Sequence, residues 1–268
     1  MINLFPKPPF TREIEPKDLY LSQQHREALA RLQFVVSRRG LGVLTGEVGA
    51  GKSTAVRALQ ANLDDTSYDF VYVHDSELRP KSFYNAVLKG LAIDPAHFLV
   101  KAKAQFREAV MDNFQSHNRQ VVIVIDDAQF LTQQMLDELR FVMNFRIDSM
   151  SPLTLILVGQ ASLWGMLKRK VNEALFQRIT VHYNLEPLNL QQAKEYIQHH
   201  IKVAGGTQAL FPEDVITRIH QYTKGLPREI NNVCFACLID AQSSGRELVD
   251  NEILDRVLAD RDVRVPVA

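Results

Sequence analysis

Five short runs of apolar, mostly β-branched residues constrain this chain more than any other feature of its sequence. They lie at 41–45, 70–74, 121–125, 153–159 and 179–185. Stretches with the periodicity of amphipathic helices separate them. Strands that alternate with helices pair in parallel, because each helix carries the chain back across a face of the sheet. The pattern therefore predicts an α/β fold with a five-stranded parallel sheet between helices.

The last third of the chain carries helical periodicity without a further strand signal. The helical stretches lie at 191–203, 212–223, 228–243 and 250–259. Gly205-Gly206 and the turn Gly225-Leu226-Pro227 separate them, with proline near the first turn of the third stretch. We therefore expect three parts: a proline-rich N-terminal arm over 1–24, an α/β core over 25–186 and a small helical domain over 187–268.

Composition and charge narrow the class of protein. A chain of 268 residues with 46% hydrophobic residues can bury a sizeable core. Its apolar runs are shorter than the roughly 20 residues that span a bilayer, and its N-terminus lacks the pattern of a secretory signal. These features predict a cytoplasmic protein without membrane contact. The formal net charge is zero, so that a nucleic-acid site would have to be a local basic patch.

The two cysteines, Cys234 and Cys237, have the C-x-x-C spacing of redox and zinc sites. Zinc would need two further ligands, and the sequence holds no second pair of cysteines. We therefore expect small apolar residues on one face of a helix.

A phosphate-binding motif, G-x-x-x-x-G-K-[ST], begins directly after the first predicted strand. Its glycines allow a tight turn whose backbone amides point at phosphates, and the helix predicted after it adds the positive end of its dipole. The motif predicts that Lys52 reaches the β- and γ-phosphates of ATP and that the Ser53 hydroxyl binds Mg²⁺. A chance match on a glycine-rich turn is the alternative, which the flanking strand and helix disfavour. The predicted nucleotide-binding residues are Gly46, Glu47, Val48, Gly49, Ala50, Gly51, Lys52, Ser53 and Thr54.

Two carboxylates, Asp126 and Asp127, follow the third apolar run directly. They emerge at the C-terminal end of a predicted strand, where α/β sheets bind their ligands. Asp126 is predicted to orient Mg²⁺, and Asp127 to polarise the water that attacks the γ-phosphate in line. An apolar run that ends in aspartate is common by itself, and the P-loop upstream is what favours the nucleotide role.

Further segments accompany these two motifs: Pro9-Phe10, 20–29, Asp126-Asp127-Ala128-Gln129, 157–160, 177–179 and 225–231. With them the sequence resembles, over nearly its whole length, the AAA+ ATPases grouped around general-secretion-pathway protein A and the transposition ATPase TnsC. The resemblance implies an AAA+ P-loop NTPase fold with a small C-terminal helical lid domain.

The resemblance also implies roles for single residues. Gln160 matches the first sensor, which contacts the attacking water or the γ-phosphate. Arg228 matches the second sensor, which reaches from the lid to the phosphates. Arg178 matches an arginine finger that acts on the nucleotide of a neighbouring subunit, with Arg169 as a rival. For the two matched arginines the alternative is a surface salt bridge.

Two positions qualify the expected nucleotide site. The related ATPases usually have glutamate where this chain has Asp127, and one methylene fewer sets the carboxylate back by about 1.5 Å. Displacement on this scale costs about a hundredfold in rate, which predicts slow hydrolysis.

Phe10 of the arm, with Pro9 or Leu19, is expected near the adenine, or alternatively as an anchor in the edge of a core.

Basic residues are concentrated between positions 79 and 107, a segment that contains six lysines and arginines and one acidic residue, Asp94. In TnsC-like relatives this region contacts the DNA backbone, so the resemblance implies phosphate contacts with double-stranded DNA by Lys81, Lys101 and Lys103. A solvated helix face is the alternative.

Two cellular roles compete. In the first, favoured one, ATP-bound subunits assemble on DNA as a ring or helical filament and help transposition by recruiting a transposase. In the second, the chain is a secretion-associated ATPase of the general-secretion-pathway protein A type, which carries a transmembrane helix and a cell-wall-binding domain that we do not find here. A replication or signalling ATPase of the same fold is a weaker third.

Overall fold

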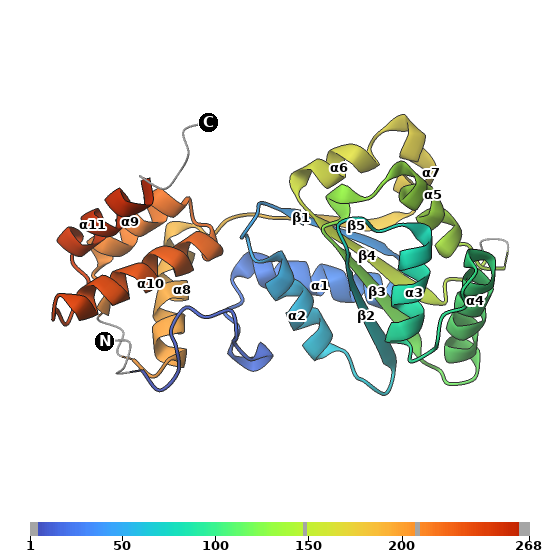
Figure 1. The fold of residues 1–268 in the computed structure, drawn as a ribbon, viewed down its shortest axis with the longest axis horizontal. Helices are drawn as coiled ribbons and strands as arrows, with labels where there is room; N and C mark the ends of the chain where they lie inside the picture. The colour runs from blue at the N-terminus through green and yellow to red at the C-terminus, as the bar shows by residue number, and fades with distance from the viewer. Residues whose placement is uncertain (1–4, 147–148, 207–209, 263–268) are drawn as a thin grey trace. The chain divides into compact units, whose positions relative to one another are not determined.

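The computed structural model of the chain describes residues 5–146, 149–206 and 210–262 (Figure 1). The chain forms two compact units. The first unit comprises the described residues of 1–23, 48–51 and 186–268. The second comprises 24–47 and the described residues of 52–185.

The second unit is built on a five-stranded parallel sheet. Its strands are β1 (Leu41–Gly46), β2 (Tyr68–His74), β3 (Gln120–Asp126), β4 (Leu153–Gly159) and β5 (Ile179–Leu185). They lie in the order β2-β3-β4-β1-β5, and every neighbouring pair is parallel. The fold predicted from the alternating apolar runs is therefore confirmed.

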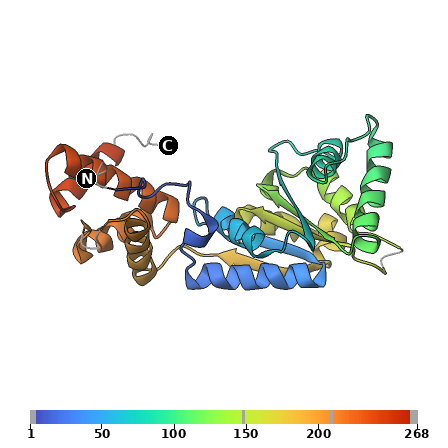
Figure 2. The ribbon, with the colours of Figure 1, turned by 90° about the horizontal axis from the view of Figure 1, so that it is seen from below.

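Helices cover both faces of this sheet, as Figure 2 shows for α1 (blue) on one face and α3 and α4 (green) on the other. These helices are α1 (Gln23–Arg38), α3 (Pro80–Gly90) and α4 (Leu99–Gln115), and the unit also holds α2 (Lys52–Asn62), α5 (Gln133–Val142), α6 (Ala161–Leu167) and α7 (Glu173–Phe176). Val35 of α1 packs against Gly42, whereas Val43 faces the core beneath α3 and α4. Coverage on both sides explains why β1 and β4 are mostly apolar and are buried along their whole length.

The helical part of the first unit consists of α8 (Leu190–Val203), α9 (Glu213–Thr223), α10 (Pro227–Ser243) and α11 (Asn251–Asp262). Cys234 and Cys237 are unbonded thiols in its core, on the buried face of α10, as expected. Burial raises the pKa of both thiols, to about 12 for Cys237. Both cysteines therefore act as small core residues.

The described part of the N-terminal arm belongs to the same unit. The Phe10 ring stacks on His200 at 5.4 Å between centroids and meets Phe211 edge-on at 6.1 Å. Tyr20 donates a 2.8 Å hydrogen bond to Glu195, and the His199 ring lies 2.6 Å from the Asp18 carbonyl oxygen. These contacts make the arm a packed segment of the helical unit. A position of the arm near the nucleotide remains a prediction.

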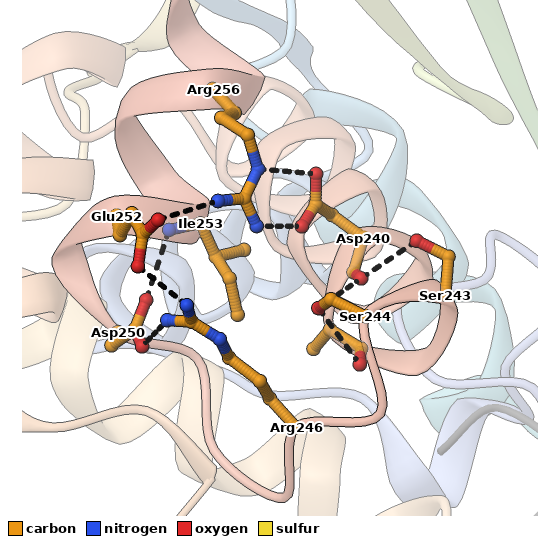
Figure 3. Close-up of polar contacts among 9 residues, drawn as sticks. Asp240, Ser243, Ser244, Arg246, Asp250, Glu252, Ile253 and Arg256 are labelled. Atoms are coloured by element: carbon orange, nitrogen blue, oxygen red, sulfur yellow. Dashed lines mark hydrogen bonds and ion pairs between the residues drawn. The ribbon is translucent and has the colours of Figure 1, made fainter.

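An ion-pair network joins α10 to α11 (Figure 3). Arg256 forms a fork with Asp240, at 2.5 and 3.2 Å, and lies 3.4 Å from Glu252. Arg246, in the connecting turn, pairs with Asp250 and Glu252. Exposed pairs contribute little singly, and a connected set with bidentate geometry contributes more. The network therefore holds the last helix against the apolar core of the unit.

No helix among the described residues combines the length and the apolar character that crossing a membrane requires.

We predict that Gly225→Ala destabilises the helical unit far more than Gly245→Ala. Both glycines have positive φ, 73° and 68°, so a side chain costs about 1–2 kcal/mol in backbone strain at either. Only at Gly225 would the new Cβ meet backbone, 2.0 Å from the Leu188 carbonyl oxygen, whereas Gly245 faces open space. This clash adds about 1–3 kcal/mol. Chemical unfolding followed by circular dichroism measures both variants, and equal losses would contradict the clash.

Acid should weaken the helical unit through His200. Burial, helped by neighbouring His199, lowers the pKa of His200 from 6.5 to about 4. The unfolded chain therefore binds this proton more tightly, and stability falls as the pH drops from 6.5 toward 4, by about 2 kcal/mol between pH 7 and pH 5. His200→Phe keeps a ring against Phe10 and should flatten this part of the unfolding curve against pH. The control variant His117→Gln, at an exposed position, should leave the slope unchanged.

Candidate functional site

The P-loop joins β1 to α2, and its backbone takes the shape that the motif requires. Gly49 and Gly51 have φ of 85° and 100°, a region that glycine enters without strain. The Lys52 ammonium donates hydrogen bonds of 2.9 and 3.0 Å to the carbonyl oxygens of Gly46 and Glu47. The predicted phosphate-binding lysine thus lies folded against its own loop. Ala50 is buried, and Ser53 is exposed in the first turn of α2.

A partly buried polar cluster supports Thr45, the residue before the loop, and sequence reasoning missed it. The Thr45 hydroxyl donates to Asn184 at 2.9 Å, so it accepts the 2.9 Å hydrogen bond from His182 Nε2. The His182 ring stacks on Trp164 at 3.7 Å. Burial, with Lys168 and Arg31 nearby, lowers the pKa of His182, which keeps the ring neutral. A signal was present, because His182 and Asn184 lie two residues apart and share one face of β5.

The tip of the P-loop and the start of α10 belong to the same unit and are in contact. The Arg228 amide donates to the Gly49 carbonyl oxygen at 3.3 Å. A Cβ on Gly49 would lie 2.8 Å from the Arg228 Cβ. Glycine at position 49 is therefore required for this approach as well as for its positive φ. The structure brings the predicted second sensor to the loop, and contact of its guanidinium with nucleotide stays a prediction.

The two aspartates at the end of β3 have different hydrogen-bond partners. Asp126 is buried, and its carboxylate accepts from the Tyr72 hydroxyl at 2.5 Å and from the Asp127 amide at 2.8 Å. Burial and the bond to Asp126 raise the pKa of Tyr72, which keeps the phenol protonated as a donor. Asp127 has a φ of 50°; its Oδ1 accepts from Gln129 at 2.9 Å, and its Oδ2 lies 3.5 Å from His74 Nδ1.

The parallel register brings three predicted positions to one edge of the sheet. Thr45 pairs with Gly159, so Gly46 and Gln160 leave β1 and β4 side by side, and Asp126 ends the adjacent strand β3. The Gln160 amide donates to Gln129 Oε1 at 3.0 Å. The candidate first sensor and the candidate water-polarising Asp127 are thus linked through Gln129.

Arg178 is not brought to this edge. It precedes β5, at the opposite end of the strands, and donates a 3.1 Å hydrogen bond to the Arg140 carbonyl oxygen beyond the middle of α5. Arg169 is exposed at the start of a short 3-10 helix. Arg178 therefore lies away from the edge that carries the P-loop, and a role in trans remains a prediction for Arg178 and for its rival Arg169.

The three lysines proposed for DNA differ in their surroundings. Lys81 and Lys101 are exposed on α3 and α4, which pack side by side (Figure 1). Lys103 instead pairs with Glu138 at 2.7 Å, and the other oxygen of Glu138 accepts from the buried Tyr84 hydroxyl at 2.6 Å. This ammonium serves a partly buried acid, which argues for a structural role of Lys103 and against a phosphate contact.

For Phe10 the sequence left two positions open, near the adenine or in the edge of a core. Its ring is only 6% exposed and belongs to the core of the helical unit. The anchor alternative therefore describes Phe10 better than contact of its ring with adenine.

The oxygen donors near the P-loop fit Mg²⁺. Ser53 offers an exposed hydroxyl and Asp126 a carboxylate, and Mg²⁺ is held in proteins by one or two such ligands together with water and substrate phosphates. No cluster of three or more His, Cys, Asp or Glu side chains forms a metal cage within the described ranges. A site that relies on phosphate oxygens does not need one.

Comparison with known proteins agrees with this geometry. Residues 35–167 match the family model described as AAA domain. General secretion pathway protein A of Aeromonas hydrophila is 34% identical over 242 residues, which cover 89% of this chain and 44% of the relative. The chain thus spans less than half the length of that relative.

Solved structures share the fold at low identity. Cdc6p of Pyrobaculum aerophilum superposes with a TM-score of 0.74 at 17% identity, over 94% of this chain and 70% of its own. A Drosophila ORC structure bound to DNA gives a TM-score of 0.71 at 15% identity, over 94% and 64%. The chain therefore carries an AAA-type ATPase domain that is related to general secretion pathway protein A.

Proposed function

We propose that this chain is a Mg²⁺-dependent ATPase that works as an oligomer. The observation that carries the proposal is the shared sheet edge, where the P-loop, Asp126, Asp127 and the start of the Gln160 segment come together. Backbone amides of the loop and the first turn of α2 would hold the phosphates, and Lys52 would turn from the loop carbonyls to the γ-phosphate. Mg²⁺ held by Ser53 and Asp126 would neutralise charge on the β- and γ-phosphates.

Asp127 is the residue proposed to polarise the attacking water. Both of its carboxylate oxygens already have neighbours, Gln129 and His74. Its side chain is one methylene shorter than the glutamate that is usual at this position in the related ATPases, so its carboxylate lies about 1.5 Å further from a water placed for glutamate. The shorter side chain supports slow hydrolysis, with ATP binding rather than rapid turnover driving assembly.

Assembly would complete the site in trans. Arg178 lies at the opposite end of the strands from the P-loop, and an arginine supplied by a neighbour stabilises the charge that develops on the transferred phosphoryl group. We place Arg178 first, because the resemblance to AAA+ ATPases matches this position. Gln160 and Arg228 would read the state of the γ-phosphate from the sheet and from the helical unit.

For the cellular role we propose ATP-dependent assembly on double-stranded DNA, as a transposition helper that recruits a transposase. Support comes from the exposed Lys81 and Lys101 and from the shared fold with an ORC structure bound to DNA. A second candidate, a secretion-associated ATPase, is favoured by the 34% identity to general secretion pathway protein A.

Electron microscopy of the chain with an ATP analogue and duplex DNA distinguishes the transposition helper from the secretion-associated ATPase. DNA-dependent rings or filaments at low salt support the first, and their absence favours the second.

Asp127→Asn should lower the rate of ATP hydrolysis by about a hundredfold or more while nucleotide still binds, because an amide cannot serve as the base. Asparagine keeps the shape and tolerates the positive φ at this position, so the fold should persist. Steady-state phosphate release and binding of a fluorescent ATP analogue measure the two properties. Lys52→Ala should instead abolish binding. Hydrolysis by Asp127→Asn at the parent rate would refute the assigned role.

Lys81→Ala and Lys101→Ala should each weaken DNA binding regardless of sequence and lower the salt slope by about one, since each lysine displaces about one counterion. Titration of fluorescent duplex DNA at several salt concentrations, with an ATP analogue present, gives the slopes. Lys202→Ala removes an exposed lysine from α8 and should leave the slope as it is. If all three variants behave alike, α3 and α4 do not form the DNA surface.

A further inference from the structure

Gln129 lies between two residues of the proposed reaction, and both ends of its amide are used. Its Nε2 donates a 2.9 Å hydrogen bond to Asp127 Oδ1. Its Oε1 accepts a 3.0 Å hydrogen bond from the backbone amide of Gln160. These partners fix the orientation of the amide, because the carboxylate needs a donor and the backbone N–H needs an acceptor.

The end of β4 is shaped to admit this side chain. A Cβ on Gly159 would lie 2.6 Å from Gln129 Oε1 and 3.3 Å from the Gln129 backbone nitrogen. Only glycine allows the amide to approach the strand this closely. Gly159 also pairs with Thr45, which directly precedes the P-loop. The Gln129 amide therefore contacts the same edge of the sheet from which the loop emerges.

The bond to Asp127 restrains a residue with an unusual backbone. Asp127 has a φ of 50° at the start of the short 3-10 helix Ala128–Phe130, which carries Gln129. The other carboxylate oxygen has only the longer contact of 3.5 Å with His74, whose side chain is more than half exposed. Of the two contacts that orient the Asp127 carboxylate, the one with Gln129 is therefore the shorter and the more strongly directional.

We propose that Gln129 is a positioning residue for ATP hydrolysis, holding the Asp127 carboxylate to the backbone of Gln160. The role rests on the proposed function and adds to it a mechanical link. A shift of the Gln160 segment when the γ-phosphate binds or leaves moves Asp127 with it. Gln129 acts through Asp127 and has no contact of its own with the reacting atoms.

Gln129→Ala tests the link in the otherwise unchanged chain. Loss of the bond frees the carboxylate, and a displacement of about 1 Å lowers kcat by about ten- to a hundredfold. KM for ATP and binding of a fluorescent analogue should stay within about twofold, because Gln129 lies outside the groups that bind phosphate. Gln134→Ala, at an exposed position of α5, should match the parent in both.

Gln129→Glu is the sharper variant, because it keeps the shape of the side chain and replaces the donor NH₂ group by an oxygen. One oxygen of the introduced carboxylate still accepts from the Gln160 backbone amide. The other oxygen faces Asp127 Oδ1 with no hydrogen to donate, and the two like charges repel each other. Gln129→Glu should therefore lose kcat at least as strongly as Gln129→Ala, while KM for ATP stays within about twofold of the parent value.

The controls separate this role from a structural one and from the proposed function. Gln134→Glu, which adds the same charge at an exposed position of α5, should keep the parent kcat. A parent kcat in Gln129→Glu or in Gln129→Ala would overturn the positioning role while ATP hydrolysis stands. A parent chain that binds ATP and never hydrolyses it would overturn the proposed function and this role with it.

Discussion

The parallel pairing of five strands is the constraint on which the rest of this structure depends. In a parallel sheet all carboxyl ends lie at one edge, so residues from separate parts of the chain meet there without any long-range sequence signal. The order β2-β3-β4-β1-β5 sets β4 between β3 and β1. Asp126, Gln160 and Gly46 consequently leave three adjacent strands at the same edge.

Polar side chains at this edge are satisfied in pairs, and this gives the site its rigidity. Thr45 is bound by His182 and Asn184 beneath the P-loop, and Asp126 by Tyr72 beside it. A buried polar atom without a partner costs about 1–3 kcal/mol, which makes each of these contacts a restraint on the backbone that bears it. The loop is thereby held in a shape that can receive phosphates before any ligand arrives.

The helical unit follows a different logic, because its stability comes from one small apolar core and the network around it. The arm supplies Phe10 to that core, and the ion pairs of Arg246 and Arg256 fasten the last helix to α10. Residue types that suggest chemistry in the sequence, such as the two cysteines, serve packing here. Arg228 and Gly49 are the exception, since their contact lies at the P-loop.

The sequence by itself determined the parallel α/β fold, the P-loop and the two aspartates. Apolar periodicity and a contiguous motif are local signals, because they depend only on residues that are close together in the sequence. It did not reveal Thr45 with His182, Tyr72 with Asp126, or the bridge from Asp127 through Gln129 to Gln160. It left open whether Phe10 lies near the adenine or in the edge of a core, and it did not reveal the pair of Lys103 with Glu138. Only the tertiary structure determined these contacts. Strand order and register set which side chains from distant parts of the sequence lie at the same edge of the sheet. Burial then requires the polar groups among them to form hydrogen bonds with one another.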